Sequence, residues 1–465
     1  MSEIEDAATP AEASTDMAAM SAEDMLNLLD DVIARAKRAG AEAADALMVE
    51  AVSLSQSQRL GKLETLERSE GRDLGLRAIV GKRQACISCS DFKKDALDEA
   101  IERAVAMARN VPEDSYCGLA DSEALAREWP ELDSEDPHEP APEELIARAA
   151  ACEEAAMAVE GITNSEGAEA SWSRGRIALA SSNGFAGSYT GTSHSVGVAV
   201  LGGEGLGMER DYDFTSKVYA EDMEDPETIG WRAGEKTVRR LNARQAKTGR
   251  YPIVFDPRVA NGLLRSFAGA INGNAVARGT SFLRDKMGEA VFASGIALVD
   301  DARLHRGLRS KPFDAEGIAT ARRLLVEDGV LQGWILDLHS ARQLGLETTG
   351  NASRGTGAPP SPSATNLYME PGELSPNELM ADIAEGFYVT EMMGHGINMV
   401  TGDYSRGAAG FWIEQGQIAY PVSGVTVAGN LKDMFANMRP ANDLELRYGV
   451  DSPTLRVEGM TLAGN

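Results

Sequence analysis

The spacing of apolar residues changes abruptly after Gly40, and this change constrains the fold more than any other feature of the sequence. Before Gly40 the apolar residues recur at helical intervals, and Ser21 followed by Asp24 has the pattern of a capped helix start. From Ala46 onward apolar and polar residues alternate, which indicates strands whose two faces meet different surroundings. The alternation predicts four successive strands, at residues 46–57, 63–70, 73–80 and 83–90.

The predicted fold class is α+β. Short connections between the four strands favour antiparallel pairing, and helical spacing returns from about Asp95 to Asn110, so the first unit is an N-terminal α-β(4)-α antiparallel unit. Helices and strands also alternate in the middle of the chain, which we describe as an α/β region. Beyond residue 271 the sequence is rich in strand and turn patterns, which predicts a C-terminal domain that is mostly β.

An acidic, proline-rich stretch separates the first two structured regions. Residues 113–144 hold twelve acidic side chains against one basic side chain, Arg127, and such a composition cannot bury a core. The first twenty residues have the composition of a disordered arm. The predicted division is a disordered acidic arm at 1–20, an N-terminal α+β domain at 21–112, an acidic Pro-rich linker at 113–142, a central domain at 143–246 and a C-terminal mostly β domain at 247–465.

The overall charge argues against two classes of partner. The formal net charge is −27 at pH 7, and such a surface repels nucleic-acid phosphates and anionic lipids. We therefore expect no direct contact with nucleic acid and none with a membrane. Four cysteines in 465 residues fit a reducing compartment, and the acidic N-terminus lacks the basic and apolar regions of a signal peptide. These features predict a cytoplasmic protein.

Several common catalytic motifs do not occur in the sequence. The glycine-rich runs do not match a phosphate-binding loop, and no serine lies in a G-x-S-x-G motif. Cys86 and Cys89 form a C-x-x-C, but on a strand their side chains point to opposite faces and cannot share a metal without a bend. We interpret one as a core residue and the other as its chance neighbour.

The histidines do not form a recognisable metal motif. Five histidines occur, and neither H-E-x-x-H nor H-E-x-x-x-H is present. His395 is the most notable because glycines flank it, although a structural role at a tight turn is favoured over a ligand role. A metal site built from His339, His395 and carboxylates is a further hypothesis.

Long motifs in the C-terminal half closely resemble the TldD/PmbA family. The longest begins at Asn398 and contains Asp-Tyr-Ser-Arg-Gly at 403–407, followed by Gly-Phe-Trp-Ile-Glu at 410–414. The resemblance extends over nearly the whole chain after about residue 25. The other matching segments are 208–213, 248–257, 340–345, 349–354, 420–422 and 426–434.

The resemblance implies a cytoplasmic heterodimeric metallopeptidase that degrades unfolded peptides and processes certain peptide precursors. In this family the TldD-type subunit carries zinc on a helix with H-E-x-x-x-H and uses a later cysteine as the third ligand. Older names describe members as modulators of DNA gyrase. The implied partners of this chain are a TldD-type subunit and unfolded peptide, with a homodimer as the alternative when that subunit is absent.

The sequence departs from the TldD-type pattern where zinc would bind. On the helix after Asp256, Arg265 and Ser266 stand roughly where the first His and the Glu belong. No cysteine follows Cys152, so the sulfur ligand is missing as well. By resemblance this chain is the PmbA-type (TldE-type) subunit, with no metal site and no catalytic residue of its own. Zinc is expected in the TldD-type partner.

Two functions from different classes follow. In the first, the chain caps a TldD-type partner and helps to enclose a cavity that admits only extended peptides. The substrate-binding residues predicted to lie nearest that cavity are Asn398, Asp403, Ser405 and Arg406. The alternative for these residues is a structural turn in which Asp403 and Arg406 pair with each other. In the second function, the chain is a stand-alone regulatory or binding protein that acts on DNA gyrase.

Overall fold

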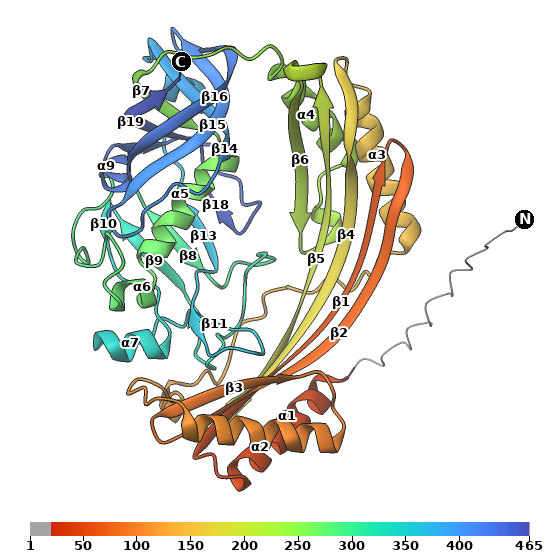
Figure 1. Cartoon of the computed structure of the whole chain (residues 1–465), viewed down its shortest axis with the longest axis vertical. Helices are drawn as coiled ribbons and strands as arrows, with labels where there is room; N and C mark the ends of the chain where they lie inside the picture. The colour runs from red at the N-terminus through yellow and green to blue at the C-terminus, as the bar shows by residue number, and fades with distance from the viewer. Residues whose placement is uncertain (1–19, 465) are drawn as a thin grey trace, which may run out of the picture.

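The chain folds into a long curved sheet and a C-terminal domain that lies along the concave side of that sheet (Figure 1). The computed structural model describes residues 20–464. The acidic arm predicted at 1–20 therefore lies, except for Met20, outside the described residues. The predicted α+β class is confirmed, with an antiparallel sheet flanked by helices in the first part and a sheet-rich C-terminal domain.

One antiparallel sheet joins the strands of the N-terminal and central regions. Its order is β3-β2-β1-β4-β5-β6, and β1 pairs with β4 from Asp45 opposite Ser181 onward. The predicted domain boundaries stay a prediction, but the first two predicted domains share this sheet. Its strands are β1 (Ala43–Arg59), β2 (Lys62–Val80), β3 (Arg83–Cys89), β4 (Ile162–Ser181), β5 (Ala186–Gly202) and β6 (Glu209–Lys217).

The first unit contains three strands where four were predicted. The segments at 63–70 and 73–80 form the single strand β2, because Gly71 and Arg72 stay extended opposite Ala51 and Glu50 and make no turn. The strands predicted at 46–57 and 83–90 are confirmed as β1 and β3.

Four helices cover the sheet on the side away from the C-terminal domain and at its end (Figure 1). The first begins as predicted, because the Ser21 hydroxyl accepts a hydrogen bond from the backbone N–H of Asp24 at 3.0 Å. Two of these helices bury Leu29 and Ile101 against the end of the sheet near β3. The other two bury Leu145 and Ile229 in a cluster with Trp172 of the sheet. These helices are α1 (Ala22–Arg38), α2 (Lys94–Asn110), α3 (Pro142–Met157) and α4 (Pro226–Arg239).

The predicted acidic linker is more closely packed than its composition suggested. It contains one short 3₁₀ turn at Ser122–Ala124, and Leu125 lies in an apolar cluster with Phe185 of the sheet region and Phe313 of the C-terminal domain. A few scattered apolar residues of the linker are enough to form this cluster, because the sheet and the C-terminal domain supply most of the side chains that pack around them. The segment therefore joins the sheet to the C-terminal domain.

The C-terminal domain is built from two sheets and short helices around one large apolar core. In the first sheet the order is β16-β15-β14-β7-β19-β17, and an additional pairing of β16 with β19 closes it on itself. Its strands are β7 (Gly249–Phe255), β14 (Glu385–Met393), β15 (Asp403–Glu414), β16 (Gln417–Asn430), β17 (Met438–Pro440) and β19 (Leu455–Ala463). The second sheet and a two-stranded ribbon contain β8 (Leu298–Asp301), β9 (Arg322–Glu327), β10 (Val330–Leu331), β11 (Ala352–Ser353), β12 (Ser361–Pro362), β13 (Asn366–Met369) and β18 (Val450–Asp451).

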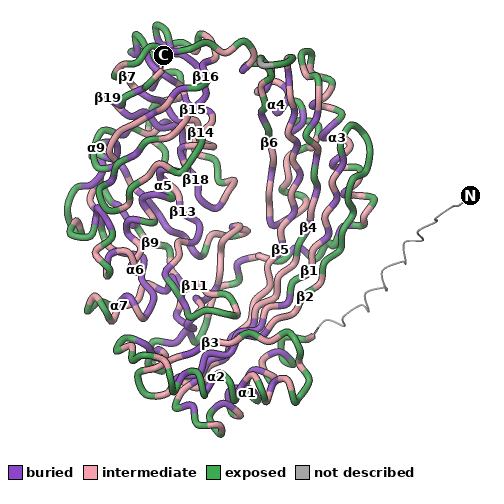
Figure 2. Tube along the Cα trace, viewed as in Figure 1, coloured by how far each residue is buried: buried purple, intermediate pink, exposed green. Residues whose placement is uncertain are grey.

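Helix α5 is the main helix of this domain, and its apolar face, with Leu263, Leu264 and Phe267, is buried in the core. Figure 2 shows the domain interior as buried and the far end of the β1–β2 hairpin as exposed. Among the described residues no helix is both long and apolar enough to cross a bilayer. The helices of the domain are α5 (Pro257–Ala270), α6 (Gly273–Ala277), α7 (Leu338–Leu344), α8 (Pro376–Met380) and α9 (Leu431–Ala436).

Candidate functional site

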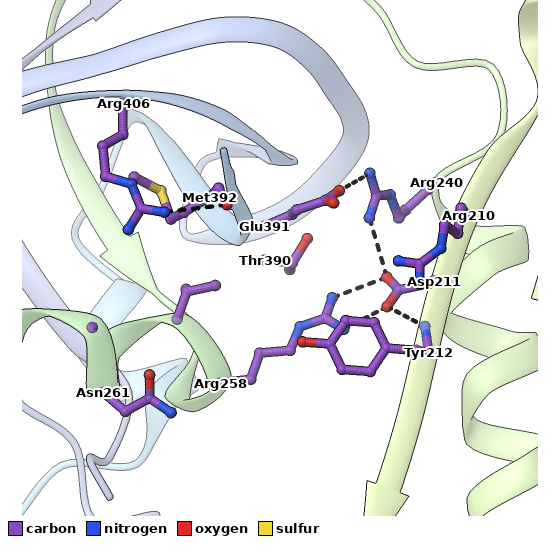
Figure 3. Close-up of a pocket in the computed structure, with 12 residues that line it drawn as sticks. Arg210, Asp211, Tyr212, Arg240, Arg258, Asn261, Thr390, Glu391, Met392 and Arg406 are labelled. Atoms are coloured by element: carbon purple, nitrogen blue, oxygen red, sulfur yellow. Dashed lines mark hydrogen bonds and ion pairs between the residues drawn. The ribbon is translucent and has the colours of Figure 1, made fainter. Parts of the chain in front are cut away.

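A polar pocket lies where the last strand of the curved sheet, β6, meets the C-terminal domain (Figure 3). It has a volume of about 260 Å³, and its walls come from β6, the end of α4, α5, β14 and β15. The helix on which zinc would be expected in a TldD-type chain and the predicted residue Arg406 meet here. Its charged lining consists of Arg210, Asp211, Arg240, Arg258, Glu391 and Arg406.

Asp211 is the most buried charge in the pocket, with 2% of its surface exposed. Arg258 of α5 binds it through two hydrogen bonds, from Nη1 to Oδ1 at 2.5 Å and from Nη2 to Oδ2 at 2.9 Å. Burial alone would raise the pKa of Asp211, but the hydrogen bonds and charge of Arg258 outweigh it and hold that pKa below its ordinary value. Because Tyr212 N–H also donates to Oδ1, at 2.7 Å, the carboxylate is well supplied with donors.

Arg240, directly after α4, lies among three carboxylates. It forms ion pairs with Glu209 at 3.3 Å and Asp211 at 3.4 Å, and its third and shortest contact is with Glu391 of β14. Burial raises the pKa of Glu209, and Arg240 opposes that shift. The carboxylates of the pocket are therefore already paired with arginines, and Arg240 and Arg258 connect the sheet to the C-terminal domain.

Arg406 differs from the other arginines of the pocket. Its Nε donates to the carbonyl oxygen of Gly394 at 3.0 Å, and its Nη2 donates to that of Met392 at 3.4 Å. Within the described residues it forms no ion pair. The guanidinium is thus oriented by backbone oxygens and the Tyr404 side chain, and no carboxylate of the described residues neutralises its charge.

The other three predicted residues lie beside Arg406 but do not line the pocket. The Asn398 side-chain oxygen accepts the N–H of Val400 at 2.9 Å. Asp403 accepts hydrogen bonds from Thr401 Oγ1 at 2.6 Å and Asn430 Nδ2 at 3.0 Å, which lower its pKa. Ser405 is exposed, and its backbone N–H donates to Gly396 O at 2.7 Å.

Asn398 and Asp403 therefore stabilise one turn, as the structural alternative expected. The pairing of Asp403 with Arg406 in that alternative is wrong. Asp403 and Arg406 are three positions apart on β15, so their side chains point to opposite faces of the sheet. Each has nearer partners: hydroxyl and amide groups for Asp403, carbonyl oxygens for Arg406.

The histidines and cysteines do not gather at the pocket. His194 is buried against Asp136 at 3.0 Å, His339 contacts Asp114 at 3.0 Å, and His395 is exposed. All four cysteines are free thiols. In the part of the chain that the structure describes, no three His, Cys, Asp or Glu side chains are grouped so that they could hold a metal ion, so His339 and His395 belong to no such group.

Helix α5 does not provide the donors that zinc requires. Arg265 is exposed, and Ser266 uses its hydroxyl to donate to the carbonyl oxygen of Gly262 at 2.8 Å. Zinc in proteins is bound by imidazole, thiolate or carboxylate groups, and neither residue offers one. The residues present on this helix therefore do not fit a zinc ion.

Comparison with known proteins identifies the family. Profiles described as PmbA/TldA metallopeptidase domain 1, central domain and C-terminal domain match residues 44–108, 135–241 and 248–464. The chain belongs to the PmbA/TldD family. The predicted family is thus confirmed, and the three matches together cover most of the chain.

Relatives in the PmbA/TldD family match nearly end to end. The metalloprotease PmbA of Escherichia coli O157:H7 is 36% identical over 93% of this chain and 94% of its own length. A crystal structure from Bacteroides thetaiotaomicron, described as a modulator of DNA gyrase, is 28% identical, with a TM-score of 0.88 over 96% of this chain and 100% of that chain. TldE from Thermococcus kodakarensis has the same fold, with a TM-score of 0.84 over 94% of this chain and 100% of that chain at 21% identity.

Sequence reasoning missed most of the pocket. It found Arg406 within a PmbA/TldD motif, but not Asp211, Arg240, Arg258 or Glu391, which come from separate elements. A signal for Asp211 existed, because the segment 208–213 had been noted as a match to the family and carries three acidic residues at alternate positions, which share one face of a strand. Nothing in the sequence pointed to their arginine partners.

Proposed function

We propose that this chain is the PmbA/TldE-type subunit of a two-subunit zinc metallopeptidase and that it does not itself hold the zinc. The observation that carries the proposal is the donor set of α5, where Arg265 and Ser266 stand in place of ligands. Hydrolysis by zinc needs protein ligands and a base for the metal-bound water. A chain of this family without them requires a second subunit, of the TldD type, to supply the metal and the reaction.

The proposed substrates are unfolded peptides, including peptide precursors, which the pair would enclose between its subunits. Asn398, Asp403 and Ser405 present exposed side chains on the turn before β15 and at the start of that strand, and Arg406 extends from the same region into the pocket. These features support a role for the four residues in substrate binding. The free state of all four thiols is consistent with a cytoplasmic location.

The test is zinc content and peptidase activity measured on the same preparations. The chain purified alone and dialysed is expected to contain almost no zinc and to leave an unfolded test peptide intact. Co-expression with a TldD-type subunit should yield a complex with about one zinc per pair that degrades the unfolded peptide but not a folded protein. One zinc per chain in the isolated protein, or hydrolysis by it, would overturn the proposal.

The alternative function is that of a stand-alone protein that acts on DNA gyrase. The description of the Bacteroides thetaiotaomicron relative as a modulator of DNA gyrase supports this alternative. The net charge of −27 disfavours direct contact with DNA, so an effect on gyrase activity would require binding to the gyrase protein itself. A salt-sensitive complex of gyrase with the purified chain, formed without any TldD-type subunit, would support this alternative. Its absence in a pull-down at low salt would remove it.

A further inference from the structure

The pocket at β6 carries one positive charge that no carboxylate of the described residues neutralises. Four arginines line it, and within the described residues three of them form ion pairs: Arg210 with Glu166, Arg240 with Glu391 and Arg258 with Asp211. Arg406 contacts carbonyl oxygens and the Tyr404 side chain, and no carboxylate among the described residues. The unpaired guanidinium makes its surroundings locally attractive to an anion, although the net charge of the chain is −27.

Two further polar groups of the pocket lack a hydrogen-bond partner among the described residues. The Thr390 hydroxyl and Arg258 Nε are buried with no hydrogen-bond partner among the described residues, and Thr390 is only 6% exposed. Figure 3 shows the Thr390 side chain between those of Glu391 and Arg258, inside the pocket. A buried polar group left without a partner costs about 1–3 kcal/mol, which a ligand that bonds to it recovers.

The unused groups are mainly donors, whereas the acceptors are occupied. Both Asp211 oxygens accept from Arg258, and Glu391 is paired with Arg240. A cation would therefore find no free carboxylate, while an anion finds the Arg406 guanidinium and the Thr390 hydroxyl. The planar fork of an arginine matches a carboxylate particularly well.

The size and position of the pocket limit the ligand. Its volume of about 260 Å³ is below the range of about 300–1,000 Å³ that is usual for drug-sized ligands, so it suits one or two amino-acid residues. The β6 edge beside it is closed to another strand, because Tyr212 N–H donates to Asp211 at 2.7 Å and Phe214 N–H donates to Asp213 at 3.0 Å. A peptide that enters cannot continue along β6, which favours a terminal group or a side chain over a mid-chain segment.

We propose that this pocket binds a peptide carboxylate, with Arg406 as its ion partner and the Thr390 hydroxyl as a second donor. The carboxylate comes either from the C-terminus of a peptide or from an acidic side chain. The proposal rests on the proposed function only for the choice of a peptide as the carrier of the carboxylate.

Binding is tested by calorimetric titration of the isolated chain, with no peptidase readout. N-acetyl-dialanine with a free carboxylate is expected to bind at least about tenfold more tightly than its C-terminal amide. N-acetyl-glutamate amide carries only a side-chain carboxylate, so its affinity relative to N-acetyl-dialanine identifies the source that the pocket prefers. Equal affinity for acid and amide would overturn the proposal, as would inorganic phosphate that binds more tightly than both carboxylates.

Variants separate binding from folding. Arg406→Gln is expected to weaken binding of the free acid at least about tenfold. Thr390→Val is expected to weaken it about three- to tenfold while leaving the melting temperature unchanged or higher, because it removes an unpaired buried hydroxyl. The matched control is Arg323→Gln, since half-buried Arg323 also donates from Nε to a carbonyl oxygen, that of Thr349 at 2.9 Å, but lies outside the pocket.

The control variant should bind as the wild type does. Unchanged binding by Arg406→Gln, or a lower melting temperature with unchanged binding in Thr390→Val, would overturn the assignment. These results do not depend on zinc or on a TldD-type subunit. The pocket proposal and the proposed function can therefore fail separately.

Discussion

At the scale of single residues, Glu316 lies in an environment that is unfavourable for a negative charge. It is 8% exposed, and its Oε2 accepts the backbone N–H of Leu338 at 2.8 Å. Burial raises its pKa, and the neighbouring charges of Asp314 and Asp337 raise it further against the opposing effect of Arg77. The pKa of Asp314 is also raised, chiefly by burial.

Replacing Glu316 with Gln should change how stability depends on pH. The ordinary pKa of the group is 4.5, so above that value the unfolded chain has lost the proton that the folded chain still holds. The free energy of unfolding therefore falls as pH rises through this window. Glu316→Gln cannot ionise, and its free energy of unfolding should rise by about 1–2 kcal/mol relative to wild type between about pH 5 and about pH 8.

Urea unfolding at several pH values measures this effect. The control is Glu327→Gln, an exposed glutamate on β9, which should follow the wild-type pH dependence. A Glu316→Gln curve parallel to the wild-type curve would show that Glu316 is ionised in the folded protein.

Residue types and motifs predicted part of the candidate site and could not predict the rest. Arg406 was found because it belongs to a long family motif. Arg258 and Asp211 are 47 positions apart and meet only because β6 and α5 pack against each other. The sequence also could not show which partner Asp403 would choose, since that depends on Asn430 of the neighbouring strand β16.

At the scale of elements, the β1–β2 hairpin depends on one side chain from a helix. The turn residues Leu60 and Gly61 both have positive φ, and their N–H groups donate to the Glu153 carboxylate of α3 at 2.8 and 2.9 Å. Gln58 Nε2 and Ser165 Oγ donate to the same carboxylate at 3.0 and 2.6 Å. Glu153 thus fastens a long, otherwise exposed hairpin to the rest of the sheet.

Glu153→Gln should loosen this hairpin tip. An amide has one acceptor oxygen in place of two and brings an N–H₂ group toward other donors, so buried donors lose their partners at a cost of about 2–3 kcal/mol in the free energy of unfolding. Amide exchange at Leu60 and Gly61 should accelerate more than exchange in the core. The neighbouring Glu154 is exposed, and Glu154→Gln should change stability by less than about 0.5 kcal/mol. Unchanged exchange at the tip would contradict the role given to Glu153.

Alternation predicted most strands but not their lengths. In the middle of the chain, the alternation did not show that β4 is a long strand that begins at Ile162 and ends at Ser181. Its first half does alternate, with Ala168, Ala170 and Trp172 buried. The intervening residues are small, so the pattern has little hydrophobic contrast in the sequence. The strands at 63–70 and 73–80 were divided at a glycine that proved compatible with extended backbone.

At the scale of the whole molecule, a buried ion triad joins the curved sheet to the C-terminal domain. Asp45 of β1 contacts Arg77 of β2, with Nε to Oδ2 at 2.9 Å, and Arg354 from the segment after β11. The Arg354 side chain is 1% exposed. Burial acts to raise the pKa of Asp45, but the charges of Arg354 and Arg77 outweigh it and lower that pKa. A Cβ on Gly75 would lie 2.2 Å from Thr356 O, so the close approach of this segment requires glycine.

Arg354→Met should weaken the attachment of the two parts. Removing one partner leaves a buried carboxylate with a single arginine, and we expect the free energy of unfolding to fall by about 2–4 kcal/mol, somewhat less than for a fully broken buried pair. Arg250 is exposed, and the control Arg250→Met should change stability by less than about 0.5 kcal/mol. The loss of stability caused by Arg354→Met should also be smaller in the Asp45→Asn background. The double-mutant cycle of these two substitutions should give a coupling free energy of about 1–2 kcal/mol. Additive losses would mean that the triad contributes packing but no specific link between the sheet and the C-terminal domain.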